Sequence, residues 1–533
     1  MKKIECENMK RIIGLIGIMM ILLSAIVSAT NYYVDSTNGN DANDGKLTAN
    51  AWKTVSKANS VLIAGDTVYI MNGLYREQIR PAHSGSAGNP IVYKNYPGHA
   101  PTLTGLNWPI WFPIGINYIV VDGINVDGGD RLTTPLNHAA WVQGDYDVIQ
   151  NCVFKNGNNN TDGGVRLLGN YGKLINCTVS HFGYYGIGDV WVEGTYNLVE
   201  GCYIEDIGHD CINNFGYHNI IRNNDLYNPI YRVADACHSG GSGARGYLVF
   251  EGNRVYGSPI LGMQANSPYG VIRRNFVYNN GQHGLGIYGS PPSMGDPSHL
   301  RIYQNTFYNN GGSGIQLNQN GVQPTDIVIE NNIAYKNIGN FPYYYNVDPA
   351  NQHEINNFVG DPSFVSESSL DFHLTSSSAC IDQGAWLTTT ASAGSGTSIP
   401  VVDAGYFIDG FGIVEGDIIQ LQGQANNARI TSINYDTNTF TVNISLTWTF
   451  GLGVSLAYSG SAPDIGAYEY VSGSPSQPVP GDLNGDGKVD VSDLSIVALD
   501  FGKTSGLINS KSDTNGDNIV DIFDIVYVAS RFT

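Results

Sequence analysis

The sequence predicts an all-β protein built on a right-handed parallel β-helix, and three observations support this fold class. A short phrase, apolar-x-x-(Cys or Asn)-x-apolar, recurs between about residues 145 and 346. Its marker residues are spaced 22 to 30 residues apart, at Cys152, Cys177, Cys202, Asn224, Asn253, Asn275, Asn305 and Asn332. The flanking residues are Val, Ile, Phe and Tyr in short runs separated by Gly and Asn. A fixed phrase at this period is typical of a solenoid.

The flanking residues decide which solenoid is expected. A leucine-rich repeat needs a regular leucine frame, and Leu is scarce here, whereas β-branched and aromatic residues favour strands. We therefore expect three short strands per coil, with equivalent residues stacked about 4.8 Å apart. The five Asn markers should form an internal ladder of hydrogen-bonded amides. The three Cys markers should continue it as buried free thiols, because parallel Cβ vectors keep stacked cysteines too far apart for a disulfide.

Composition limits the function classes. The chain has 533 residues, enough for two or three domains, and 14% of them are charged. The net charge of −20 argues against nucleic acid or an anionic membrane as partner. Abundant Gly and Tyr are expected of an exported all-β protein. The disulfide state of Cys211, Cys237 and Cys380 stays open from the sequence.

Residues 1–29 are predicted to be a signal peptide. Lys10 and Arg11 precede an apolar run from Ile12 to Val27, and Ser28-Ala29 provides a small-residue cleavage site. The alternative is an uncleaved anchor, but the run is shorter than the roughly 20 residues that a membrane span prefers. The mature protein is therefore expected to be secreted, with no membrane span after cleavage.

The mature chain divides into successive units. A helix over about residues 51–63, with Trp52, Val55, Ala58 and Leu62 on one face, should cap the first coil of a β-helix domain spanning 30–385. Residues 386–462 alternate in short apolar strands and predict a small β-module inserted before a closing segment at 463–470. A Ser-, Gly- and Pro-rich linker at 471–480 leads to a tail domain at 481–533.

Several motifs in the first unit and its closing segment resemble those of extracellular proteins of the pectin-lyase-like superfamily. They are Tyr32-Tyr33-Val34-Asp35, the helix and turn from Trp52 to Asp66, Gly65 to Ile70, Gly88 to Ile91, Gly360 to Phe364, Phe372-His373-Leu374 and Asp464 to Glu469. The resemblance implies a scaffold used mainly by polysaccharide lyases, and also by hydrolases, epimerases and non-catalytic proteins. The lysine and arginine signatures of the pectate, alginate and chondroitin lyases are not found, which leaves the reaction open.

The tail carries two copies of a calcium-loop pattern. Oxygen ligands recur at loop positions 1, 3, 5, 7, 9 and 12, as calcium requires. The first copy has Asp482, Asn484, Asp486, Lys488, Asp490 and Asp493, and the second has Asp513, Asn515, Asp517, Ile519, Asp521 and Asp524. Lys488 and Ile519 would each lend a backbone carbonyl, and an apolar helix follows each loop. The tail resembles a dockerin, which implies two bound calcium ions and a cohesin-bearing scaffold protein as partner.

Aligning the coils on their markers predicts a polar outer face on a second strand. The residues expected there, or on its leading turn, are Arg166, His209, Asp210, Asn213, Asp235, His238 and His283. The longest coils lengthen through 239–246 and 289–298, which would build a wall beside this face. A walled groove with a polar floor suits a polysaccharide, with Arg166, Asn213 and His283 as binding residues. The alternative is that these residues are merely solvated.

Asp210 and Asp235 are the predicted catalytic pair. The alignment places them in adjacent coils with Cα atoms about 5 Å apart. Two carboxylates so close either share a cation, as in a calcium-assisted lyase, or raise one pKa, as in a retaining glycosidase. His209, His238 and Arg245 are the expected bases or oxyanion partners. The alternative is a pair of aspartates splayed into solvent at two turns.

Two functions follow from these expectations. The first is an exported lyase or glycoside hydrolase acting on an acidic polysaccharide such as pectin or alginate. The second is a non-catalytic cell-surface or carbohydrate-binding protein whose solenoid is a spacer or adhesin.

Overall fold

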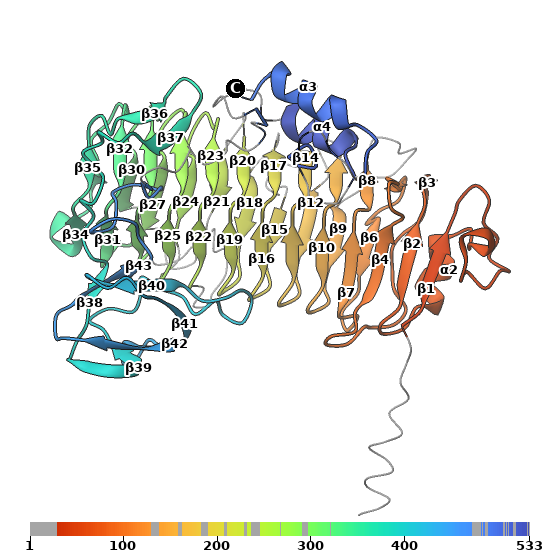
Figure 1. Ribbon diagram of the computed structural model, residues 1–533, viewed down its shortest axis with the longest axis horizontal. Coiled ribbons are helices and arrows are strands. Elements are labelled where there is room, and N and C mark those ends of the chain that lie inside the picture. Colours follow the sequence, from red (N-terminus) through yellow and green to blue (C-terminus); the bar gives the residue numbers. More distant parts are fainter. Residues whose placement is uncertain are drawn as a thin grey trace, which may run out of the picture.

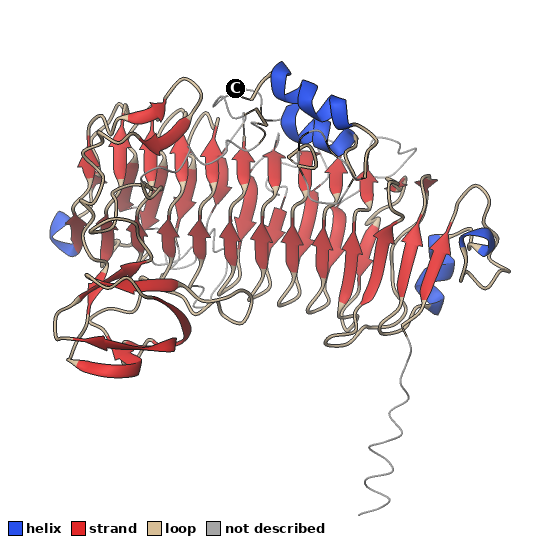
Figure 2. Ribbon diagram, in the orientation of Figure 1, coloured by secondary structure: helices blue, strands red, loops and turns tan. Residues whose placement is uncertain are grey.

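The computed structural model describes most of the chain between residues 29 and 531. The described residues are 29–128, 138–157, 163–182, 190–206, 210–228, 232–235, 246–266, 268–289, 297–319, 321–471, 481, 483–484, 489–504, 507, 509, 511–514, 519–529 and 531. Strands dominate them (Figure 2). Among them, no helix is long and apolar enough to span a membrane.

Three parallel sheets run along the molecule (Figure 1) and confirm the predicted parallel solenoid, of about ten turns. Sheet A contains β1 (Asn31–Val34), β2 (Thr67–Ile70), β4 (Ile91–Asn95), β7 (Ile119–Asp122), β10 (Val148–Gln150), β13 (Lys173–Ile175), β16 (Leu198–Glu200), β19 (Ile220–Arg222), β22 (Val249–Glu251), β25 (Val271–Arg273), β28 (Arg301–Tyr303), β31 (Ile327–Glu330) and β34 (Gln352–Ile355). Sheet B contains β3 (Leu74–Tyr75), β5 (Thr102–Thr104), β8 (Asn125–Asp127), β11 (Val153–Lys155), β14 (Thr178–Phe182), β17 (Tyr203–Asp206), β20 (Asp225–Tyr227), β23 (Arg254–Tyr256), β26 (Phe276–Tyr278), β29 (Thr306–Tyr308), β32 (Ile333–Tyr335) and β35 (Phe358–Val359). Sheet C contains β6 (Ile110–Phe112), β9 (His138–Val142), β12 (Gly163–Leu167), β15 (Val190–Val192), β18 (Asp210–Asn214), β21 (Arg232–Asp235), β24 (Met263–Ala265), β27 (Leu285–Gly289), β30 (Ile315–Gln319) and β33 (Tyr343–Tyr345).

Each marker residue lies at the corner between a strand of sheet A and the next strand of sheet B. The residue before it has a positive φ, such as 55° at Asn223 and 66° at Gly252. This left-handed conformation turns the chain sharply and is most accessible to Gly and Asn. Inward side chains of the three sheets then form one continuous core along the solenoid.

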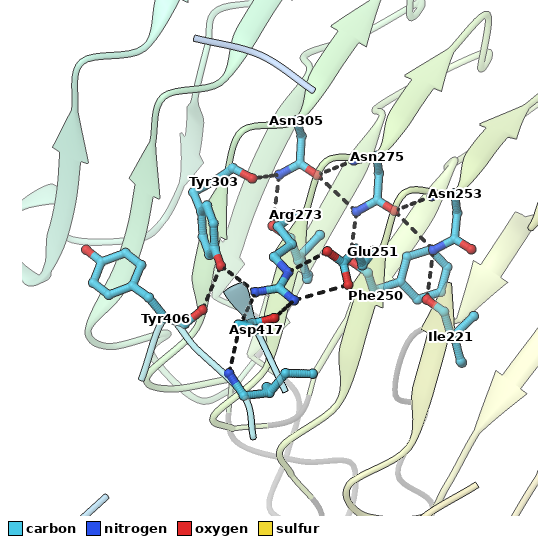
Figure 3. Close-up of polar contacts among 12 residues, drawn as sticks. Ile221, Phe250, Glu251, Asn253, Arg273, Asn275, Tyr303, Asn305, Tyr406 and Asp417 are labelled. Atoms are coloured by element: carbon cyan, nitrogen blue, oxygen red, sulfur yellow. Dashed lines mark hydrogen bonds and ion pairs between the residues drawn. The ribbon is translucent and has the colours of Figure 1, made fainter. Parts of the chain in front are cut away.

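The predicted asparagine ladder is confirmed. Asn224, Asn253, Asn275, Asn305 and Asn332 are at most 2% exposed. The Oδ1 of Asn305 accepts hydrogen bonds from the backbone N–H and the Nδ2 of Asn275, at 3.0 and 2.9 Å, and the pattern repeats along the stack (Figure 3). Each amide also donates to a strand carbonyl of the preceding coil, as Asn275 does to Phe250 at 2.9 Å.

The three cysteine markers extend this ladder as expected. Cys152, Cys177 and Cys202 are buried thiols outside any disulfide. The backbone N–H of Cys202 donates to Oδ1 of Asn224 at 2.9 Å, which joins the thiol stack to the amide stack. Cys380 is also a buried thiol, whereas Cys237 lies outside the described residues.

Replacing Asn275 with leucine should lower the free energy of unfolding by about 1–3 kcal/mol. The change leaves the carbonyl of Phe250 and the backbone N–H of Asn253 without their partners in a dry interior. The shift is read from guanidinium unfolding followed by circular dichroism. Asn427→Leu is the control, because Asn427 is exposed in the antiparallel sheet described below. Equal midpoints for the two variants would contradict a structural role for the ladder.

The predicted N-terminal helix is present but shorter than expected. Helix α2 covers Val55–Val61, and its N-cap residue Thr54 accepts a hydrogen bond from the backbone N–H of Lys57 at 3.1 Å. Val55, Ala58 and the flanking Trp52 and Leu62 join the main core cluster. The capping role remains a prediction. Two single-turn 3₁₀ helices, η1 (Thr48–Asn50) and η2 (Pro349–Asn351), are also present.

Residues 388–456 form a six-stranded antiparallel sheet, called here the β-module, which packs on sheet A (Figure 1). Its strands are β38 (Thr388–Thr389), β39 (Gly394–Pro400), β40 (Ile418–Leu421), β41 (Asn427–Asn434), β42 (Thr439–Trp448) and β43 (Gly453–Leu456). Outward apolar side chains of sheet A, including Leu198, Ile220, Val249 and Val271, share a core cluster with it. Consecutive apolar residues such as Ile220-Ile221 are therefore explained, because this part of sheet A is buried on both faces.

A buried ion pair joins the β-module to the solenoid (Figure 3). The side chain of Arg273 is 1% exposed and binds the carboxylate of Asp417 through two nitrogens, at 2.7 and 2.6 Å. It also contacts Glu251 at 3.0 Å and the hydroxyl of Tyr303 at 3.0 Å. Although burial acts to raise the pKa of Glu251, the Arg273 guanidinium holds it below its ordinary value.

The outer face of sheet B is covered on the strands of the later coils. The hairpin β36 (Phe364–Ser366) and β37 (Asp371–Leu374), with Ile465 and Ala467, packs over Phe276 and Tyr308 of sheet B. The motifs that carried the family resemblance at this end are therefore packing elements.

The tail contains two helices, α3 (Val491–Asp500) and α4 (Ile522–Ala529), packed around a small core. Val489 and Val520, at position 8 of the two loops, are fully buried in it. The residue at position 8 of each loop therefore packs that half of the tail into the shared core.

Candidate functional site

Among the described residues, sheet C is the sheet on which neither the β-module nor the closing segment packs. In the described part of the chain, no outward side chain of sheet C joins the clusters formed with the β-module or the closing segment. The predicted wall segments fall largely in 236–245 and 290–296, which lie outside the described residues. A ligand-binding surface along the coils is therefore best sought on this sheet.

One line of outward residues crosses all ten strands of sheet C, and we call it the outer row. The strand register aligns Trp111, Trp141, Arg166, Trp191, Asn213, Asp235, Gln264, Gly286, Gln316 and Tyr343. Its N-terminal part is aromatic and cationic, and its C-terminal part is mostly amide. Neighbouring members stand about 4.8 Å apart, so the row is continuous at the scale of a sugar chain.

The aromatic part of the outer row is built around Arg166. Its guanidinium lies between two indole rings, 4.7 Å from the ring centroid of Trp141 and 4.5 Å from that of Trp191. Its Nε also donates to Glu193 at 2.8 Å. At the end of the row, the exposed Arg80 lies 3.9 Å over the ring of Trp111. This surface combines apolar ring area with positive charge.

The amide part of the outer row is more enclosed. Asn213, Gln264 and Gln316 are 4 to 8% exposed. The Oε1 of Gln316 accepts a hydrogen bond from the hydroxyl of Tyr288 at 3.0 Å, which orients the amide. Amides both donate and accept, so this part suits hydroxyl groups.

His283 lies beside the amide part and is held neutral. Its Nδ1 accepts the backbone N–H of Ser313 at 2.9 Å, so Nε2 carries the proton. Desolvation lowers its pKa, and its ring stacks 6.3 Å from that of Tyr343. These contacts fit the predicted substrate-binding role of His283 better than a role as a general base, because Nδ1 is already occupied as an acceptor.

The predicted juxtaposition of Asp210 and Asp235 is wrong. Asp210 pairs with Arg232, and Asp235 pairs with Asn213, so the two aspartates are three positions apart along adjacent strands. Strand geometry then separates their Cα atoms by about 11 Å. Asp210 is also fully buried, not on the outer face. A shared cation or a retaining carboxylate pair made by these two residues is therefore not supported.

The misalignment of Asp210 with Asp235 arose because the coil that carries Asp235 is longer than its neighbours. Trp141, Arg166, Trp191, Asn213 and Gln264 each precede their coil's marker by 11 residues, but Asp235 precedes Asn253 by 18. The extra residues follow β21, and an alignment that put Cys237 level with Ile212 missed that Ala234 is the true partner. His209, His238, Arg245 and the side chain of Asp235 lie outside the described residues.

The three tryptophans of the outer row were missed by the sequence analysis, although a signal was present. Trp141 and Trp191 share the 11-residue offset with Arg166, which the sequence analysis did select. Applying that offset to the coils with Cys markers, instead of choosing only polar residues, would have found Trp141 and Trp191.

The tail's two loops share one geometry at position 12. Asp493 accepts the backbone N–H groups of Leu483 and Asp490 at 2.8 and 2.9 Å. Its counterpart Asp524 accepts that of Asp521 at 2.8 Å. Both carboxylates are fully buried. Carboxylate oxygens are of the kind that calcium binds, but Asp482, Asp486, Lys488, Asn515 and Asp517 lie outside the described residues. Within the described part of the chain, no group of three or more His, Cys, Asp or Glu side chains could hold a metal ion, so the two calcium sites stay predictions.

Comparison with known proteins agrees with the fold. Residues 188–358 match the family model "Right handed beta helix region", which agrees with the parallel solenoid and identifies it as a right-handed β-helix. An uncharacterized protein of Bacillus subtilis (strain 168), YwoF, is 35% identical over 75 residues, and the match spans 14% of this chain and 16% of that protein.

Three solved structures illustrate the partial similarity of this chain to other folds. Pectate lyase Pel9A has a TM-score of 0.47 at 17% identity, covering 84% of this chain and 98% of its own. A complex of XylC with xylose has a TM-score of 0.46 at 12% identity, covering 80% and 100%. The polysaccharide lyase Pedsa3628 from Pseudopedobacter saltans has a TM-score of 0.43 at 18% identity, covering 62% and 96%.

Proposed function

We propose that the protein is an exported polysaccharide-degrading enzyme, a lyase or glycoside hydrolase, that binds an acidic polysaccharide along the outer row of sheet C. The observation that carries this proposal is the row itself. Among the described residues, the β-module packs on sheet A and the closing segment packs on sheet B, and neither packs on sheet C. The row also joins aromatic, cationic and amide groups in one line.

Each part of the row has a role in this proposal. The indole edges of Trp111, Trp141 and Trp191 would offer apolar area to the C–H groups of sugars, because arginine guanidinium groups already lie over their ring faces. The exposed guanidinium of Arg80 would pair with a uronate carboxylate, as in pectin or alginate. The amides of the C-terminal part would bind hydroxyl groups.

The chemical step is proposed for residues selected from the sequence, whose side chains lie outside the described part of the chain. In a lyase, a base removes the proton beside the uronate carboxyl group, the glycosidic C–O bond breaks, and a double bond remains. We propose Asp235, His209, His238 and Arg245 as the groups that supply the base and the positive charge, with one calcium ion in the groove as a further proposal. Asp210 is too buried to contact substrate directly.

The tail is proposed to be a dockerin that binds two calcium ions and attaches the enzyme to a cohesin outside the cell. The repeated geometry of Asp493 and Asp524 supports the duplicated loop. Together with the predicted signal peptide, this implies a secreted protein held at a cell surface or scaffold.

A non-catalytic carbohydrate-binding protein is the second candidate. It is favoured by the composition of the outer row, because its described members are of types that suit sugar binding, whereas Glu193, the carboxylate beside Arg166, is ion-paired. Product release from a panel of pectin, alginate and neutral polysaccharides separates the candidates. Unsaturated ends identify a lyase, new reducing ends alone identify a hydrolase, and retained binding without products identifies the second candidate.

Replacing Trp141 and Trp191 together with alanine should weaken polysaccharide binding by about tenfold or more, because two aromatic surfaces worth roughly 0.5–1.5 kcal/mol each are lost. Affinity electrophoresis measures the change. Trp386→Ala is the matched control, since Trp386 lies beside Tyr458 outside sheet C. Unchanged binding in the double variant would remove sheet C from consideration.

A further inference from the structure

A second concave site lies where the β-module meets the solenoid. It is a cavity of about 320 Å³ between the module and the coils that carry β22, β25 and β28. That volume is at the lower end of the range for small-molecule pockets. The tryptophan end of the outer row stands on β6, β9 and β15, near the other end of sheet C (Figure 1), so the two surfaces are separate.

The solenoid wall of the cavity is a stack of aromatic rings. Tyr247, Tyr269 and His299 occupy equivalent turns before sheet A, with successive ring centroids 5.1 and 4.7 Å apart. All three have φ near 57°, which fixes the same side-chain direction in each coil. Because the three rings are stacked face to face, their edges line the cavity.

The module supplies the opposite wall. Tyr435 places its ring 5.9 Å from that of Tyr247, and its hydroxyl donates to the carbonyl of Phe407 at 3.0 Å. The buried pair of Arg273 and Asp417 fixes the module against sheet A. The two walls are therefore held in place without a ligand, and binding requires little ordering.

The polar lining of the cavity is rich in acceptors. Asp403, Asp436 and Asn438 line it from the module, and Arg301 lines it from β28. The Arg301 guanidinium is already held by Asp403 at 2.9 Å and by Asp326 at 3.2 Å. The site therefore has a local excess of carboxylate, which repels anions and accepts hydrogen bonds from hydroxyl groups.

We propose that this cavity binds a neutral saccharide, such as the end or side chain of a polysaccharide. Aromatic edges contact the C–H groups of a sugar ring, while the carboxylate and amide oxygens accept its hydroxyl protons. The same charge excludes uronic acids, so its specificity differs from that of the outer row. The inference does not depend on the activity proposed for sheet C.

A larger residue at Gly405 would fill the cavity without removing any side chain that lines it. A Cβ added there would lie 3.0 Å from an Asp403 carboxylate oxygen and 3.9 Å from Nε of Arg301, and its φ is not in the left-handed region. Gly405→Leu should therefore occupy the site. Val402→Leu is the matched control, because Val402 is 62% exposed and does not line the cavity.

The test is isothermal titration calorimetry of the full chain with neutral sugars, namely glucose, galactose, xylose and their disaccharides, and with galacturonate. At least one neutral sugar should bind, and galacturonate should not. Gly405→Leu and, separately, Asp436→Ala should weaken that binding by about tenfold or more, whereas Val402→Leu should not. Asp436 is exposed, so its variant tests the site even if Gly405→Leu does not fold.

Three outcomes would overturn the proposal. They are no binding of any neutral sugar to the wild-type chain, unchanged binding in both cavity variants, and equal binding of galacturonate. The variant lacking Trp141 and Trp191 must keep this binding. If that variant lost it, the neutral sugar would bind sheet C instead. Failure of the cavity is thus distinguished from failure of the function proposed for sheet C.

Discussion

Replacing Arg273 with methionine should lower the free energy of unfolding by about 3–5 kcal/mol, the largest stability effect expected in this protein. The side chain is 1% exposed, and its removal leaves the largely buried Asp417 and the partly exposed Glu251 without their cation. The β-module loses its ionic attachment to sheet A at the same time. Guanidinium unfolding and limited proteolysis within residues 388–456 measure the two effects.

Arg222→Met is the matched control for this prediction. Arg222 occupies the same column of sheet A two strands away and pairs with Glu200 at 2.7 Å, but both side chains are about a quarter exposed. An ion pair so accessible to water contributes roughly 0–1 kcal/mol. A similar cost for the two variants would show that burial of Arg273 is not what fixes the module.

Removing calcium should unfold the tail and abolish cohesin binding, the largest expected effect on a partner. In the proposed calcium loops, several carboxylates would come together around each ion, and without a cation their repulsion would oppose folding. The buried Asp493 and Asp524 would be most affected, because a carboxylate out of water needs compensation. Circular dichroism with and without chelator, and cohesin binding by surface plasmon resonance, measure these changes.

The solenoid serves as the internal control for calcium removal. Its core rests on apolar packing and the asparagine ladder, so its β-sheet signal should persist in chelator. Asp493→Asn combined with Asp524→Asn should reproduce the loss of cohesin binding at saturating calcium. A tail that keeps its helical signal and its cohesin affinity in chelator would disprove the calcium assignment.

Much of the solenoid followed from sequence because its key contacts are local and periodic. Each marker occupies the same corner of each coil, and its amide has only one place to bond, on the next copy of itself. The period therefore predicted strands, buried markers and the free thiols of Cys152, Cys177 and Cys202. The helix at Val55–Val61 was also found, although its ends were set too wide.

The candidate site was only partly predictable. Arg166 and Asn213 were correctly placed on the second strand of the coil, because the apolar alternation of that strand is readable. The pairing of Asp210 with Asp235 was predicted wrongly. A coil of irregular length allows more than one strand register, and only the hydrogen bonds between strands select one.

The sequence by itself determined the repeat, the inward residues and the calcium-loop pattern, since each depends on spacing along the chain. The tertiary structure alone decided which faces of the solenoid are covered. The β-module covers sheet A through apolar contacts and the pair of Arg273 with Asp417, residues 144 positions apart. The outer row of sheet C and the cavity beneath the module both follow from that packing. No local pattern encodes it, because its energy comes from surfaces that meet only in the folded chain.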